Sequence, residues 1–103
     1  MAGEGKPVLA LVTYRAAAGN EERLAGVLRT HIARLRELDL LADRPTFAAA
    51  RLDQPGTVVE QFWWLHRGAA EQAKDNSELQ EIWMRLEDLC DGNIERVELS
   101  PLD

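Results

Sequence analysis

Residues 58–65, Val-Val-Glu-Gln-Phe-Trp-Trp-Leu, constrain the fold of this chain more than any other segment. β-branched and aromatic residues predominate, which favours a strand over a helix, and the segment is too short to cross a membrane. Apolar side chains fall on both faces of such a strand, so both faces must be covered. We expect the protein's own helices to cover one face and a second copy of the chain to cover the other.

The remaining elements follow from hydrophobic periodicity and from turn residues. A helix of about 20 residues is predicted from Asn20, a short helix over 69–75 and another from Ser77, where Ser-Glu-Leu-Gln has the form of a capping box. Strands are predicted over residues 7–15, 46–53, 58–65 and 94–99. The order βαββαβ indicates a ferredoxin-like α+β fold with a four-stranded antiparallel sheet, in which the two most apolar strands are central.

A turn at Pro55 and Gly56 joins the second and third strands. With these two residues at its centre, the expected register places Arg51 opposite Glu60. One face of the hairpin is then expected to carry Arg51, Ala49, Phe47, Glu60, Phe62 and Trp64. The other face is expected to carry Leu52, Ala50, Ala48, Val59, Gln61, Trp63 and Leu65.

Two helices can cover only one face of a four-stranded sheet, so the second face is left as an exposed apolar patch. Such patches mark interfaces, and a two-fold homodimer is the commonest closed assembly. The predicted dimer interface consists of Leu52, Val59, Gln61, Trp63 and Leu65.

Composition narrows the function classes. The chain has 103 residues and is expected to be a single domain over 1–103, with its core over about 7–100. Its net charge of -6 argues against nucleic acid as a partner. Cys90 is its one cysteine, and no cluster of His and carboxylates has metal-ligand spacing, so no metal site is expected. No segment is apolar over enough residues for a signal peptide or a membrane span, and we expect a cytoplasmic protein that makes no contact with a membrane.

Two sequences in the chain carry a resemblance to a known family. Val-Glu-Gln-Phe-Trp-Trp over 59–64 and Leu-Gln-Glu-Ile-Trp over 79–83, with the Ala-rich helix between them, resemble the antibiotic biosynthesis monooxygenase-like domains of the dimeric α/β-barrel superfamily. The resemblance covers residues 7–100 at the level of topology. It implies a homodimer with a pocket in each subunit for a small aromatic or quinol-like metabolite, and a monooxygenase-like activity that needs no cofactor.

The chain departs from the family pattern at two positions. Cofactor-free monooxygenases of this family have an Asn and a Trp four residues apart on the third strand; Trp64 matches the Trp, but Glu60 stands at the Asn position. Haem-degrading relatives have a haem-ligating His about ten residues after that Trp, where this chain has Lys74. Haem is therefore not an expected cofactor.

Glu60 and His31 are the candidate catalytic residues. A carboxylate between apolar neighbours can act as a general base, and a neutral imidazole on the apolar stripe of the first helix can shuttle a proton. Each has a purely structural alternative: Glu60 pairs with Arg51, and His31 is packed and hydrogen-bonded in the core. The candidate substrate-binding residues are Trp64, Phe62, Arg51, Trp83 and Tyr14.

Two functions remain open at this point. The chain is either a cofactor-free oxygenase or a non-catalytic homodimer that binds a metabolite or assists a partner. An open cavity carrying Glu60 favours the enzyme, and a pocket packed shut by Phe62, Trp64 and Trp83 favours the binding protein. If the aromatic residues do not line a pocket, they are core residues. Tyr14 is expected to line either the pocket or the interface.

Overall fold

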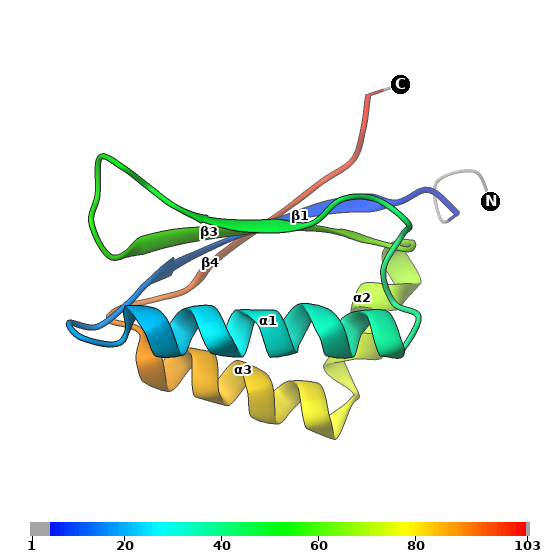
Figure 1. Cartoon of the computed structure of the whole chain (residues 1–103). Helices are drawn as coiled ribbons and strands as arrows, with labels where there is room; N and C mark the ends of the chain where they lie inside the picture. Colours follow the sequence, from blue (N-terminus) through cyan, green and yellow to red (C-terminus); the bar gives the residue numbers. More distant parts are fainter. Residues whose placement is uncertain (1–4, 103) are drawn as a thin grey trace.

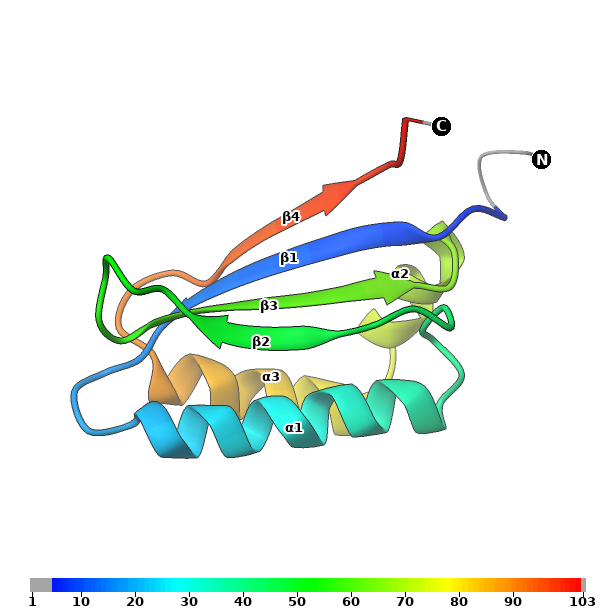
Figure 2. The same cartoon turned by 45° about the horizontal axis from the view of Figure 1, so that its top comes forward.

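The computed structural model describes residues 5–102, which form a four-stranded antiparallel sheet on a layer of helices. The central strands are β1 (Val8–Arg15) and β3 (Thr57–Trp64), and the edge strands are β2 (Phe47–Ala50) and β4 (Glu95–Leu99). The strands lie in the order β2-β3-β1-β4 (Figure 2). This order confirms the predicted ferredoxin-like α+β fold, with the two most apolar strands at the centre.

All the helices of the described chain lie on one side of the sheet. Helices α1 (Glu21–Glu37) and α3 (Ser77–Leu89) run beside each other beneath it, and α2 (Arg67–Lys74) lies at the end where β3 finishes (Figure 1). No helix within the described residues is long and apolar enough to cross a membrane. The opposite face of the sheet carries no element of the described chain.

Local sequence explains where the helices start and which faces they bury. Helix α1 buries Leu24, Leu28, His31 and Leu35, whose spacing of three and four residues places them on one face. Helix α3 is capped by Asn76, one residue before the predicted Ser77, and the Asn76 side chain accepts a hydrogen bond from the Leu79 amide at 3.0 Å. The break between α2 and α3 was predicted from this sequence and is confirmed.

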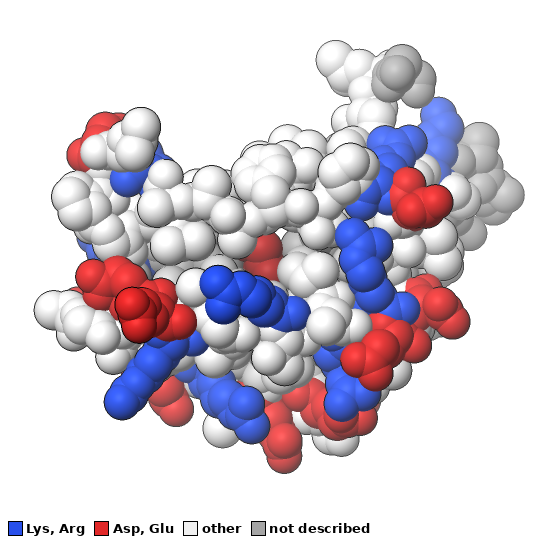
Figure 3. Space-filling view, in the orientation of Figure 1, with Lys and Arg blue, Asp and Glu red and all other residues white. Residues whose placement is uncertain are grey.

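Burial alternates along the two central strands because successive side chains point to opposite faces. On the helix side, the strands contribute buried residues to the core. These are Ala10, Val12, Tyr14, Glu60, Phe62 and Trp64. The side chains between them, such as Leu11 and Trp63, are only half-buried and belong to the outer face. In Figure 3 the middle of the upper rim, where this outer face lies, is almost free of charged side chains.

The predicted turn between β2 and β3 is correct, but the predicted register is wrong. Thr57 donates a backbone hydrogen bond to Gln54 at 3.1 Å, and Gly56 has a φ of 87°, as a type II turn requires. However, β2 ends at Ala50, and the Arg51 amide bonds back to Thr57 at 2.8 Å, so residues 51–56 form a loop.

The three-residue shift exchanges the two faces of β2. Phe47 pairs with Gln61 on the outer face, and Ala48 pairs with Glu60 on the helix side. Arg51 lies in the loop and binds Asp53 instead, with nitrogen–oxygen distances of 2.9 and 2.6 Å. Leu52, predicted on the strand, is fully exposed in the same loop. The faces predicted for β3 are correct because its period-two pattern does not depend on the hairpin register.

Candidate functional site

The candidate site begins at Glu60, a carboxylate that is completely buried on the helix side of β3. The β1–β3 pairing places Glu60 opposite Val12 and Tyr14 opposite Val58, so Tyr14 and Glu60 are diagonal neighbours on one face. The Tyr14 hydroxyl donates a hydrogen bond to Glu60 Oε1 at 2.7 Å. The two central strands therefore hold Tyr14 and Glu60 side by side on the face of the sheet that the helices cover.

Helix α1 supplies the second partner of Glu60. His31 is buried on the stripe that α1 turns to the sheet, and its Nδ1 lies 2.9 Å from Glu60 Oε2. From α3, Trp83 donates its indole N–H to His31 Nε2 at 3.0 Å. The result is a hydrogen-bonded chain, Trp83–His31–Glu60–Tyr14, which joins α3, α1, β3 and β1.

The chemistry of Trp83 fixes the protonation state of His31. An indole nitrogen can only donate, so His31 Nε2 must accept, and the imidazole proton resides on Nδ1. Nδ1 then donates to Glu60, which accepts from Tyr14 as well and is an ionised carboxylate. The contact between His31 and Glu60 is thus a charge-assisted hydrogen bond of a neutral imidazole. Every buried side-chain nitrogen and oxygen in the described residues has a partner.

Burial also fixes the state of Tyr14. Loss of solvation raises the pKa of its hydroxyl far above the ordinary value of 10.0, and the nearby charge of Glu60 and the hydrogen bond to it raise this pKa further. The positive charge of Arg96 opposes these effects only in part. Tyr14 therefore remains a neutral donor to Glu60 in the folded protein.

An alkaline titration tests this arrangement, since Tyr14 is the only tyrosine of the chain. The folded state holds the Tyr14 proton more tightly than the unfolded state. The stability from this proton is therefore complete below about pH 10 and falls above it by up to about 1.4 kcal/mol per pH unit. We expect tyrosinate absorbance to appear only together with unfolding, and the stability of Tyr14→Phe to be less sensitive to pH in this range. Gradual ionisation near pH 10 without unfolding would contradict the buried contact.

Next to this chain lies a cavity of about 320 Å³, the inner cavity, between the sheet and α2 and α3. Its wall includes His31, Tyr14 and the rings of Phe62, Trp64 and Trp83. Phe62 and Trp64 meet edge to face with ring centroids 5.0 Å apart, and His31 meets Phe62 in the same way at 5.7 Å. The wall is thus aromatic, with an imidazole and a phenol as polar groups within it.

The structure brings most of the predicted site residues together, but with different partners. His31, Tyr14, Phe62, Trp64 and Trp83 all line the inner cavity. Glu60 does not line it and lies behind His31 and Tyr14. The alternative that Glu60 pairs with Arg51 is wrong, since Arg51 is exposed in the β2–β3 loop and is not part of the cavity wall.

Charged residues at the cavity wall were not predicted as part of the site. Pairing of β4 with β1 places Arg96 opposite Val12 and Glu98 opposite Ala10, so both point to the helix side, and α2 and α3 add Lys74 and Glu87. Arg96 and Glu98 are two residues apart in the sequence, so they lie on the same face of the strand. Only the pairing with β1 shows which face it is. Within residues 5–102, no group of three or more His, Cys, Asp or Glu side chains is placed to hold a metal ion.

Comparison with solved structures identifies the fold. SnoaB, a cofactor-independent oxygenase from Streptomyces nogalater, superposes with a TM-score of 0.81 at 12% identity, with 94% of each chain covered. An antibiotic biosynthesis monooxygenase superposes with a TM-score of 0.78 at 10% identity, over 93% of this chain and 99% of the other. This chain has the antibiotic biosynthesis monooxygenase-like fold.

A third solved structure has the same fold over almost its whole length. Rv0793 from Mycobacterium tuberculosis superposes with a TM-score of 0.80 at 18% identity, over 95% of this chain and 97% of the other. No family model and no curated protein matches the sequence of this chain. The likeness to the monooxygenase-like structures is therefore one of fold, and the function must be argued from the site.

Proposed function

We propose that the protein is a cofactor-independent monooxygenase-like enzyme that acts on a small phenol or quinol in the inner cavity. The observation that carries this proposal is the position of His31: its Nδ1 is held by the buried carboxylate of Glu60, and its ring lines an aromatic cavity. A base oriented by a carboxylate beside an apolar pocket is the arrangement that general-base catalysis requires. The cofactor-independent oxygenase activity of SnoaB supports the same class of reaction.

Proton transfer to His31 is the proposed first step. The substrate hydroxyl replaces the Trp83 indole N–H at His31 Nε2, which is the only nitrogen of the ring that can accept. The proton then moves from the hydroxyl to Nε2, and the imidazolium that forms is stabilised by the Glu60 carboxylate 2.9 Å from Nδ1. Glu60 is a positioning residue in this scheme, and Tyr14 holds its second oxygen in place.

The phenolate then reacts with dioxygen, which is the oxidant and the second substrate. It gives one electron to dioxygen, and the two radicals combine at a ring carbon that carries hydrogen. The peroxide formed takes back the proton from His31 Nε2, and loss of water, with the hydrogen of that carbon, leaves a quinone. One oxygen atom ends in the new carbonyl and the other in water, so a phenol and dioxygen give a quinone and water. The aromatic wall of Phe62, Trp64 and Trp83 orients the ring and excludes bulk water from it.

The outer face of the sheet supports the proposal that the enzyme is a homodimer. This face carries the half-buried Trp63 on β3, and large exposed apolar side chains on the edge strands β2 and β4 and directly after β3. Phe47, Val97, Leu99 and Leu65 are the exposed members. A second copy is the occupant we propose, because a two-fold axis makes one apolar face complementary to itself without leaving another such face open.

A non-catalytic metabolite-binding protein is the second candidate, and one observation favours it. The Trp83 N–H already occupies the lone pair of His31 Nε2, so the whole polar chain is satisfied without a ligand. In this case the His31–Glu60–Tyr14 contacts serve only to hold helix α1 on the sheet. The ligand would then bind against the rings without giving up a proton.

Binding of para-nitrophenol separates the two candidates, since its phenolate is yellow and its neutral form is not. At a pH where the free phenol is neutral, we expect the wild-type protein to turn the bound phenol yellow. We expect His31→Gln to bind it in the colourless form. An exposed acid on α3, Glu81, provides the control Glu81→Gln, which should behave like the wild type. Colourless binding by the wild-type protein would favour the second candidate.

A further inference from the structure

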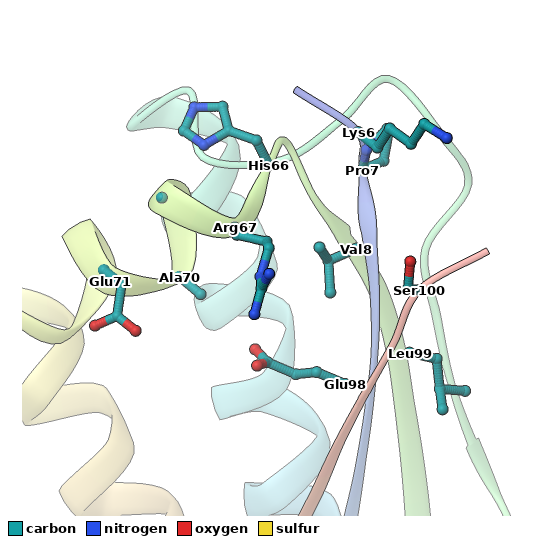
Figure 4. A pocket seen from close by; sticks show the side chains of 11 residues that line it. Lys6, Pro7, Val8, His66, Arg67, Ala70, Glu71, Glu98, Leu99 and Ser100 are labelled. Carbon is teal, nitrogen blue, oxygen red and sulfur yellow. The ribbon is translucent and has the colours of Figure 1, made fainter. Parts of the chain in front are cut away.

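A second cavity adjoins the inner one at the end of the molecule where β1 begins and β4 ends. This outer cavity, of about 950 Å³, lies between those strand ends and the first turns of α2 (Figure 4). Ala70 of α2 and Glu98 of β4 line both cavities. The two cavities are therefore neighbours that share part of their wall.

Two opposite charges face each other inside the outer cavity. Arg67 extends from the first residue of α2, Glu98 extends from β4, and their charged ends point toward one another (Figure 4). Within residues 5–102, neither side chain has an ion-pair partner within 4.0 Å. Glu71, on the same wall, is already paired with Lys74 at 3.5 Å. Lys6 also lines the cavity, but its side chain points away from these two residues (Figure 4). Arg67 and Glu98 are thus the uncommitted charges that face each other in this cavity.

Such a pair is suited to a ligand that carries both charges. A carboxylate alone would be attracted by Arg67 but repelled by Glu98. An ammonium group alone would be attracted by Glu98 but repelled by Arg67. A ligand with both groups can place its carboxylate on the guanidinium, which binds carboxylates through two parallel hydrogen bonds, and its ammonium group on Glu98. The charge pattern thus selects against singly charged ligands.

We propose that the two cavities together bind a phenolic amino acid. Its ring enters the inner cavity with the hydroxyl on His31, and its amino and carboxylate groups lie between Glu98 and Arg67. This inference names the substrate class of the site and rests on the proposed function. The proposal requires the ligand to pass between the cavities beside Ala70, which is the small side chain in the wall that they share.

Four matched ligands test the proposal by calorimetry at low ionic strength. L-Tyrosine carries both charges, para-hydroxyphenylpropanoate only the carboxylate, tyramine only the ammonium group, and N-acetyltyrosinamide neither. We expect tyrosine to bind about tenfold more tightly than either singly charged ligand. Arg67→Met should abolish the advantage of tyrosine over tyramine, and Glu98→Gln its advantage over para-hydroxyphenylpropanoate. Arg85→Met, which removes an exposed arginine from α3, should change neither.

The outcomes separate this inference from the function on which it rests. Equal affinity for tyrosine and N-acetyltyrosinamide would overturn the role of the outer cavity but leave the phenol site of the inner cavity intact. Failure of all four ligands to bind, together with colourless binding of para-nitrophenol, would overturn both. Binding of para-cresol, which reaches only the inner cavity, is an independent check: Arg67→Met should leave it unchanged, because Arg67 lines the outer cavity and not the inner one.

Discussion

Replacing Trp63 with Glu is expected to convert the proposed homodimer into a monomer. Trp63 lies on the outer face near the end of β3, and a carboxylate buried there against an apolar copy of the same face has no partner across the two-fold axis. Burial would also remove water from the new carboxylate, and Arg44 of its own chain would offset this loss only in part, so a net cost of about 3 kcal/mol would weaken the dimer more than about 100-fold. Inside its own chain the new carboxylate does have a partner, because the Arg44 guanidinium lies 4.3 Å from the centre of the Trp63 ring.

The matched control is Met84→Glu, which adds the same charge at an exposed apolar residue of α3, on the helix layer. Light scattering at micromolar concentration should give a monomer mass for Trp63→Glu and a dimer mass for Met84→Glu. Circular dichroism should give the same secondary structure for both. A Trp63→Glu protein that remains dimeric would show that the outer face of the sheet is not the interface.

The sequence was sufficient to divide the residues of β3 between the two faces. Glu60, Phe62 and Trp64 point to the helices and Gln61 and Trp63 point outward, as predicted. This follows from period two alone, once the segment is taken as a strand, and needs no knowledge of what pairs with it. Helix α1 was predicted for the similar reason that its apolar spacing is local.

The partner of Glu60 could not be found in the same way. The prediction of Arg51 rested on a two-residue loop, but Arg51 binds Asp53 and the chain leaves the ladder after Ala50. The true partners, Tyr14 and His31, come from another strand and from a helix. Their approach depends on the β1–β3 register and on the packing of α1, which are properties of the whole fold.

The hydrogen bond from Trp83 to His31 was outside the reach of sequence reasoning for a related reason. Each residue lies on the stripe of its own helix that packs against the rest of the molecule, so each was predicted correctly as inward-facing. Whether an indole N–H meets an imidazole nitrogen depends on the rotamers of both side chains and on the relative positions of α1 and α3. The tautomer of His31, which the proposed chemistry requires, follows only from that contact.

Loss of oxygen consumption in His31→Gln is the second large effect that we expect. Without an imidazole at the wall of the inner cavity, the phenol keeps its proton and cannot give an electron to dioxygen. Removal of a general base lowers rates by about 100-fold or more. Glu60→Gln should lower the rate as well but by less, because it leaves the imidazole in place and removes only the charge that stabilises its protonated form.

The most direct test of the proposed oxygenase is the rate of oxygen uptake by the protein with a panel of phenols and hydroquinones. Wild type and Glu81→Gln, the exposed control on α3, should consume oxygen at the same rate with at least one member of the panel. His31→Gln should consume it at least about 100-fold more slowly while still binding the same phenol. Equal rates for wild type and His31→Gln, or no uptake by the wild type with any phenol that it binds, would contradict the proposed oxygenase.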